Sequence, residues 1–145
     1  MLWQLYLRKG MAYVPTVAQT EAGFYTNIEP VAVIPVTDSE ALENAIEIAM
    51  SKGNPIVPTP TRDAFPKPVV LQYAKVKSWS AFEKDALNWT IVETAGRYQI
   101  EPGRKRPDGK GWEPDPDRVE SLPPGTTHDE VARRVATLLA QAAVG

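Results

Sequence analysis

The sequence contains no cysteine and a single histidine, His128. The absence of cysteine excludes disulfide bridges, thiol nucleophiles and thiolate metal sites, and is compatible with a reducing compartment. A serine-histidine-acid triad would have to use His128, but no serine lies in a GxSxG turn. We therefore expect no catalytic residue and no zinc site, and we expect His128 to be an exposed residue in the first turn of a helix.

The chain also lacks phosphate-binding loops and long apolar runs. Neither GxxxxGK[ST] nor GxGxxG occurs. No stretch approaches the roughly 18 apolar residues of a transmembrane helix, and the opening MLWQLYLRKG does not have the layout of a signal peptide. These absences favour a cytoplasmic protein that is not an enzyme, needs no cofactor and does not bind membranes.

The length of 145 residues suits one domain, residues 1–145, with a core that needs no disulfide or metal. The net charge is −2 and the isoelectric point is near 5.5. Non-specific binding of nucleic acids needs a concentrated cationic surface, so this balance argues against a general polyanion binder. The oligomeric state is left open by the sequence.

The clearest helix signal runs from Asp38 to Lys52. Thr37 and Glu40 have the spacing of a capping box, and Gly53 supplies the left-handed residue that ends many helices. One side of this helix is apolar at i, i+3, i+4 and i+7, and must be buried against a sheet. The apolar side consists of Leu42, Ala45, Ile46 and Ala49. The acidic outer side consists of Glu40, Glu43, Asn44 and Glu47.

Period-two alternation and turn residues predict an antiparallel sheet around this helix. Pro15 cannot donate to a ladder, so it belongs at an edge or a bulge. The segment 54–68 holds five prolines and leaves no room for regular structure. The predicted strands are 2–8, 11–17, 23–28, 31–36, 69–77, 89–93 and 97–101, with turns at Lys9-Gly10 and at the three-residue loop Thr94-Ala95-Gly96.

Two further capping boxes predict two more helices. The first spans Ser80 to Glu83 and opens a short helix that ends near Leu87, and the second spans Thr127 to Glu130. The buried face of the C-terminal helix is predicted to be Val131, Val135, Leu138, Leu139 and Ala142. The fold class is therefore α+β, a largely antiparallel sheet with two longer helices and one short helix packed on one face.

Charge is segregated along the chain. Residues 1–52 carry three basic and six acidic side chains, residues 53–110 carry ten and six, and residues 111–145 carry three and six, so the net charges are −3, +4 and −3. Either the segments neutralise one another in the fold, or an acidic patch built from the first helix faces a basic partner.

The second proline-rich segment, 102–124, holds the candidate binding residues. The run Arg104 to Arg106, with Lys110 and Trp112, could hold a phosphate and stack a base. Residues 101–120 nevertheless contain five basic residues and six acids, which favours a dipolar loop that folds back on itself. Carboxylates that alternate with prolines could bind magnesium, although such clusters are more often solvated loops; they are Glu113, Asp115 and Asp117.

The stretch YQIEPGRKRPDGKGWEPDPDRVESLPPGTTHDEVARRVATLLAQA, residues 98–142, resembles the small cytoplasmic immunity proteins of bacterial contact-dependent growth inhibition and related polymorphic toxin systems. The expected α+β domain with exposed aromatics and irregular loops also resembles them. The resemblance covers the last third of the chain. It implies stoichiometric neutralisation of a cognate toxin domain, often a nuclease, and identifies no site residues.

On this interpretation the partner-binding surface combines the acidic helix face with the loop from Trp112 to Asp117. The carboxylates would steer a basic toxin, and Trp112 would be the buried anchor, because core packing does not obviously need an aromatic in a flexible polar loop. Alternatively, Trp112 closes the sheet edge or covers Pro114. The set is Glu40, Glu43, Glu47, Trp112, Glu113, Asp115 and Asp117. Other hypotheses are a self-associating structural subunit, a weak nucleic-acid-binding domain that uses Arg104–Lys110, and an enzyme with a carboxylate pair.

Overall fold

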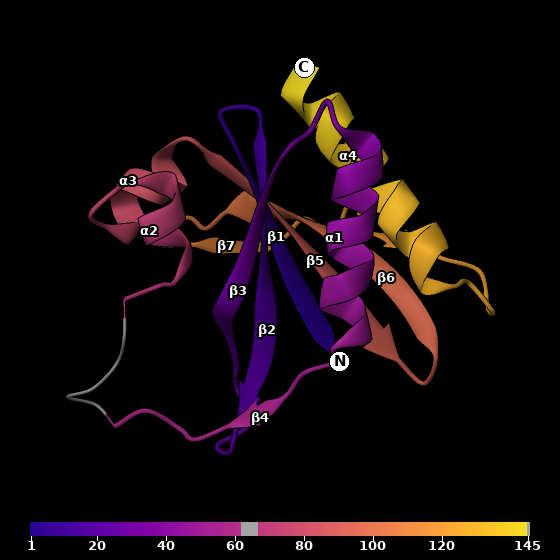
Figure 1. Ribbon diagram of the computed structural model, residues 1–145, viewed down its shortest axis with the longest axis horizontal. Coiled ribbons are helices and arrows are strands. Elements are labelled where there is room, and N and C mark those ends of the chain that lie inside the picture. Colours follow the sequence, from indigo (N-terminus) through magenta and orange to yellow (C-terminus); the bar gives the residue numbers. More distant parts are fainter. Residues whose placement is uncertain (62–66, 145) are drawn as a thin grey trace.

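A twisted sheet forms the centre of the computed structural model, which describes residues 1–61 and 67–144 (Figure 1). The order of its main strands is β3-β2-β1-β5-β6-β7, and all pairings among the described strands are antiparallel except that of β4 with β2. The strands are β1 (Leu2–Arg8), β2 (Met11–Thr20), β3 (Tyr25–Pro35), β4 (Ile56–Val57), β5 (Ala86–Thr94), β6 (Arg97–Lys105), β7 (Trp112–Pro114) and β8 (Glu120–Ser121).

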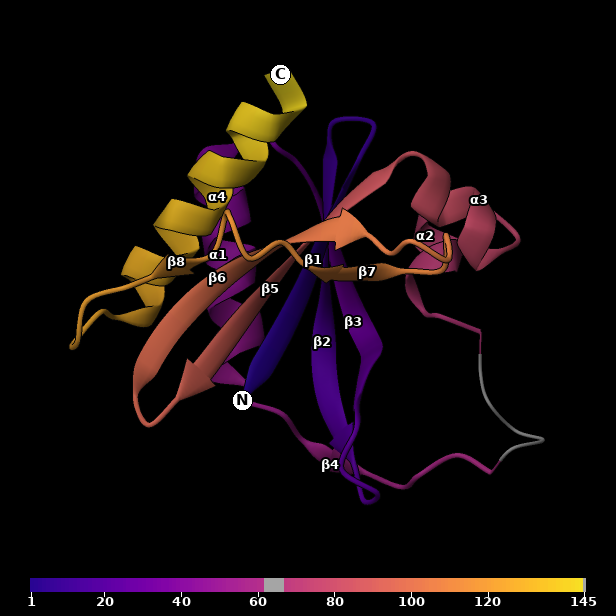
Figure 2. The ribbon, with the colours of Figure 1, turned by 180° about the vertical axis from the view of Figure 1, so that it is seen from behind.

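The described residues form four helices, two long and two short. They are α1 (Ser39–Ser51), α2 (Val70–Ala74), α3 (Trp79–Lys84) and α4 (His128–Val144). This confirms the α+β class and adds one short helix to it. Helices α1 and α4 lie side by side over the sheet, whereas α2 and α3 lie beside the edge strand β3 (Figures 1 and 2). No helix in the described residues is long and apolar enough to cross a bilayer.

The helices cover both faces of the sheet, and not one face as the sequence led us to expect. Consecutive residues of β1 show this, because Leu5 belongs to the cluster under α1 and α4, while Tyr6 belongs to a second cluster with Leu71 of α2 and Phe82 of α3. Side chains alternate across a strand, so the two clusters lie on opposite faces. Period-two alternation is typical of a half-buried strand, but both faces of β1 are largely covered.

Helix α1 follows the prediction in its packing and differs in its cap. Leu42, Ile46 and Ala49 are buried, and Gly53 ends the helix with a φ of 64°. One free amide of the first turn is capped by Asp38, whose Oδ1 accepts a hydrogen bond from Ala41 N at 3.2 Å. The predicted capping box at Thr37 is therefore wrong, because the short Asp38 side chain already occupies the cap position one residue later.

The stretch 69–77 was predicted to be a strand and contains α2 instead. Val70 and Leu71 are consecutive and both buried, which a helical turn permits and a one-faced strand does not. The helix ends at Lys75, where φ is 58°. The next helix, α3, starts earlier than predicted, because the hydroxyl of Ser78, and not that of Ser80, accepts from the backbone N–H of its first turn.

The turns of the sheet largely follow the sequence. Lys9 and Gly10 both have positive φ, as a tight hairpin between β1 and β2 requires. The β5–β6 loop has two residues and not three, since Thr94 still pairs with Arg97. The register of β2 against β3 shifts after Pro15, so the predicted bulge is confirmed. The predicted strands 23–28 and 31–36 join into the single strand β3.

The proline-rich segments contain more regular structure than predicted. Strand β4 lies in the first segment, and β7 and β8 lie in the second. Residues 62–66 of the first segment lie outside the described residues. Short strands of two or three residues have no periodicity to read, so only their pairing with β2 and β6 identifies them.

The cluster under α2 and α3 makes a pH-dependent contribution to stability through Tyr6. Burial raises the pKa of the Tyr6 phenol to about 12, although the Asn27 amide that donates to its oxygen at 3.0 Å partly opposes this. Between pH 10 and 12 the unfolded chain loses the Tyr6 proton while the folded protein keeps it. The contribution of Tyr6 to the free energy of unfolding is therefore complete below pH 10 and is lost as pH rises towards 12.

We expect this loss to reach about 2–3 kcal/mol for wild type. Tyr6→Phe lacks the ionisable group and should show a shallower decline over the same range. Urea denaturation of both proteins at pH 9, 10, 11 and 12 measures the difference; parallel curves would contradict a buried, protonated Tyr6.

Candidate functional site

The outer side of α1 presents a row of carboxylates to solvent. Glu40 is exposed, and Glu43 and Glu47 are partly exposed one turn and two turns further along. None of the three forms an ion pair or a side-chain hydrogen bond with any described residue. Their negative charge is therefore not compensated locally.

Most other carboxylates of the described chain are engaged internally. Glu120 accepts two hydrogen bonds from Arg134, at 2.9 and 3.0 Å, and this raises the pKa of the Arg134 guanidinium. Other ion pairs are Arg8–Asp85, Arg104–Glu113, Lys105–Glu83, Arg106–Asp108 and Arg133–Asp129. The contrast leaves α1 as the element with the largest group of unpaired acids in the described residues.

Trp112 does not lie in a flexible loop, as was predicted, but in strand β7. It pairs with Lys105 of β6, whose ammonium lies 4.6 Å from the centre of the indole ring. The ring also contacts Tyr6 and Trp79, with centroids 5.8 and 5.7 Å apart. The alternative interpretation, that Trp112 closes the sheet edge, agrees with the structure, because β7 is the edge strand next to β6. Trp112→Ala would remove packing, so a loss of binding in that variant would not identify an interface.

The structure does not bring the predicted interface residues together. Helix α1 covers one face of the sheet, whereas Trp112 packs into the cluster on the opposite face. Accordingly, α1 is in front of the sheet in Figure 1 and β7 is in front in Figure 2. The acidic helix face and the Trp112 side chain therefore lie on opposite sides of the sheet.

The carboxylates after Trp112 are partly used by their own hairpin. Glu113 pairs with Arg104 at 3.2 Å, and Asp115 Oδ1 accepts from the backbone N–H of Asp117 at 3.2 Å. The backbone N–H of Asp115 donates to Pro102 O at 2.8 Å, which joins this stretch to β6. Asp117 is exposed, so of the three it is the one whose carboxylate stays open to solvent.

The basic run folds back on itself, as the balance of charges predicted. Arg104 and Arg106 pair with acids of the same hairpin, and the 3.6 Å contact of Arg106 is with Asp108 at its tip. Lys105 pairs with Glu83 of α3 at 3.8 Å and also donates to the Glu83 carbonyl oxygen. Because these three cations are compensated, the run offers little free charge to a nucleic acid.

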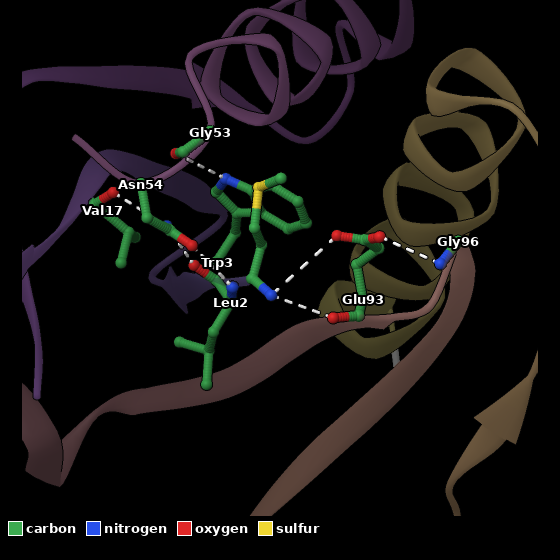
Figure 3. A network of polar contacts seen from close by, with 8 residues as sticks. Leu2, Trp3, Val17, Gly53, Asn54, Glu93 and Gly96 are labelled. Carbon is green, nitrogen blue, oxygen red and sulfur yellow. Dashed lines mark hydrogen bonds and ion pairs between the residues drawn. The ribbon is translucent and has the colours of Figure 1, made fainter. Parts of the chain in front are cut away.

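The orientation of α1 depends on an asparagine that the sequence interpretation overlooked (Figure 3). Asn54 Nδ2 donates to Leu2 O at 2.8 Å and to Val17 O at 2.9 Å, while its Oδ1 accepts from Leu2 N at 3.0 Å. Next to it, Trp3 Nε1 donates to Gly53 O at 3.1 Å. These bonds attach the end of α1 to β1 and β2. The signal available in the sequence was an amide side chain directly after a helix-terminating glycine.

The single histidine was predicted to be exposed and is half-buried. His128 does lie in the first turn of α4, but its ring lies edge-on to Trp3 and Tyr98, with centroids 6.3 and 5.8 Å away. The capping box before it is confirmed, since Thr127 Oγ1 accepts from Glu130 N and Thr127 N donates to Glu130 Oε1. His128 therefore fills the gap between the start of α4 and the sheet.

Comparison with known proteins gives a likeness of fold. No protein-family model matches the sequence, and no curated protein matches it. The structure is similar to a protein of unknown function, NMB0488 from Neisseria meningitidis, with a TM-score of 0.63 and 15% identity over 98% of this chain and 94% of that one. It is also similar to a chain of the CdiA-CT/CdiI toxin and immunity complex from Yersinia pseudotuberculosis, with a TM-score of 0.63 and 14% identity over 98% of this chain and 95% of that one.

Proposed function

We propose that this protein is a cytoplasmic immunity-type binding protein, which neutralises a cognate toxin domain by stoichiometric association and is not itself an enzyme. A likeness of fold to a chain from a toxin and immunity complex, along nearly the whole length of both, supports a role in such a pair. At 14% identity that likeness names no partner and no contact residues, so the choice of surface depends on this chain's own side chains.

The observation that carries the proposed surface is the uncompensated acidic side of α1. A toxin that acts on nucleic acid needs a basic surface for its substrate, and an inhibitor of such a toxin benefits from carboxylates of the opposite sign. Glu40, Glu43 and Glu47 offer these charges from one rigid helix, which Asn54 and the buried stripe hold in place. Charges of this kind mainly set the association rate and the register of the complex.

The test uses the partner that co-purifies with the protein from its native host. Reversing Glu43 and Glu47 to lysine together should slow association about tenfold or more at low salt, and the effect should shrink as ionic strength rises. Stopped-flow association rates at 50 and 300 mM salt measure both quantities. The physical reason is that long-range attraction between exposed charges is screened by salt.

The matched control reverses Glu21, which is exposed, and Glu101, which is partly exposed; both lie on other parts of the molecule and lack an ion pair within the described residues. Both double variants change the net charge by the same amount. The proposal expects the control to associate at close to the wild-type rate. Equal slowing by the two variants would show a net-charge effect alone, and an unchanged rate for the α1 variant would place the interface on another face.

A further inference from the structure

A pocket of about 550 Å³ lies between the edge strand β3 and α2, on the sheet face opposite α1. Its wall is formed mainly by apolar side chains, namely Ile28 from β3 and Pro68, Val69, Leu71 and Val76 around α2. A second pocket of about 360 Å³ has three lining residues in common with the first, Asn27, Lys67 and Pro68, and continues to Tyr25 and Trp79. Together they offer space for a drug-sized molecule.

One buried polar atom in this wall has no partner. Asn27 uses its Nδ2 to donate to Tyr6 OH at 3.0 Å, which determines how the amide is turned. Its Oδ1 is buried and accepts no hydrogen bond from the described residues. A buried carbonyl oxygen without a donor is unfavourable, but because this atom is covered by its neighbours a ligand in the pocket does not reach it.

The lining of the pocket carries two lysines and one carboxylate, so its net charge is positive. Lys67 and Lys77 line it, are exposed, and form no ion pair with any described residue. The carboxylate in the lining, that of Glu29, accepts hydrogen bonds from Gln72 Nε2 and Tyr73 OH. Glu29 raises the pKa of the Tyr73 phenol, which keeps that donor protonated, and the pair of bonds attaches α2 to β3. Glu29 therefore supports the wall while keeping its negative charge, and the two lysines leave the lining with a net charge of one positive unit.

We propose that this pocket binds a small amphipathic anion, with an apolar ring system for the Leu71 and Val76 wall and an acidic group for Lys67 and Lys77. This inference does not depend on the proposed toxin partner, because the pocket and the acidic side of α1 lie on opposite faces of the sheet. The requirement is one negative charge on an apolar body.

The probe is 8-anilinonaphthalene-1-sulfonate, which has fused rings, a sulfonate and an anilino N–H. Titrated into the full chain, it should give saturable fluorescence with one site per protein, and backbone amide shifts in NMR spectra should be centred on Ile28, Leu71 and Val76. Lys67→Glu combined with Lys77→Glu should weaken binding at least tenfold, because it replaces attraction of the sulfonate by repulsion.

The matched control is Lys75→Glu combined with Lys84→Glu, which makes the same charge change on exposed lysines outside the wall of this pocket. It should bind within about threefold of wild type. Circular dichroism checks that both variants are folded. If the pocket variant is unfolded, the positions of the amide shifts in the wild-type protein decide whether the probe binds in the pocket. Shifts centred elsewhere, equal weakening by both variants, or no saturable binding would overturn the proposal. If the probe fails and the purified protein partner shifts the same amides, the pocket is a protein contact and the small-anion proposal is wrong.

Discussion

Replacing Phe82 by alanine is expected to lower the free energy of unfolding by about 3–5 kcal/mol, the range seen when a buried aromatic is truncated. The Phe82 side chain is 0% exposed. Its ring lies edge-on to Tyr6 and Tyr13, at centroid distances of 5.5 and 5.6 Å, and stacks on Trp79 at 5.3 Å. The truncation therefore leaves a cavity among three rings and also removes their favourable aromatic contacts.

Urea denaturation followed by circular dichroism measures this loss. The control is Leu87→Ala, which truncates an apolar side chain just beyond α3 that is 44% exposed. Surface truncations usually change stability by no more than about 0.5 kcal/mol. A Phe82→Ala protein that unfolds within that margin of wild type would show that α3 is not packed on the sheet.

Helix α1 provides a second large effect with a control from the same element. Ile46 is 1% exposed and Ile48, two residues later, is 49% exposed. Ile46→Ala should cost about 2–5 kcal/mol, as Leu42→Ala should, because each removes buried methyl groups from the interface between α1 and the sheet. Ile48→Ala removes the same atoms from the surface, so it should cost about 0.5 kcal/mol or less.

The two isoleucine variants share their residue type, helix and loss of volume, so only burial separates them. The same denaturation experiment therefore tests the placement of α1 without a correction for helix propensity. Equal losses in Ile46→Ala and Ile48→Ala would mean that the apolar stripe does not face the sheet as the structure places it.

The sequence was most informative where one local rule decides the structure. Apolar residues that recur every three to four positions located α1 and α4, because helices of 13 and 17 residues contain several turns of this pattern. The turn at Lys9-Gly10 was readable from its glycine, whereas the positive φ of Lys9 was not, because lysine has no preference for it. In contrast, α2 has five residues, too few for a period, and its position is decided by contacts with β3 that a linear pattern does not contain.

The candidate site was predicted in part for a similar reason. That Glu40, Glu43 and Glu47 face solvent follows from helical spacing alone. That Glu83 and Glu113 are neutralised does not, because their partners, Lys105 and Arg104, reach them only after the β6–β7 hairpin has folded against α3. Trp112 was misplaced on the same grounds, since a three-residue strand in a polar, proline-rich segment has no pattern of its own.

The position of β1 between the two clusters restricts how the gene can vary. Leu5 and Tyr6 face opposite clusters, so a deletion or insertion of one codon within residues 2–8 would send each following side chain of the strand to the wrong face. Changes of residue identity at fixed length affect one cluster at a time. A mutagenesis library of this protein should therefore vary β1 among apolar residues of similar size and hold its length constant.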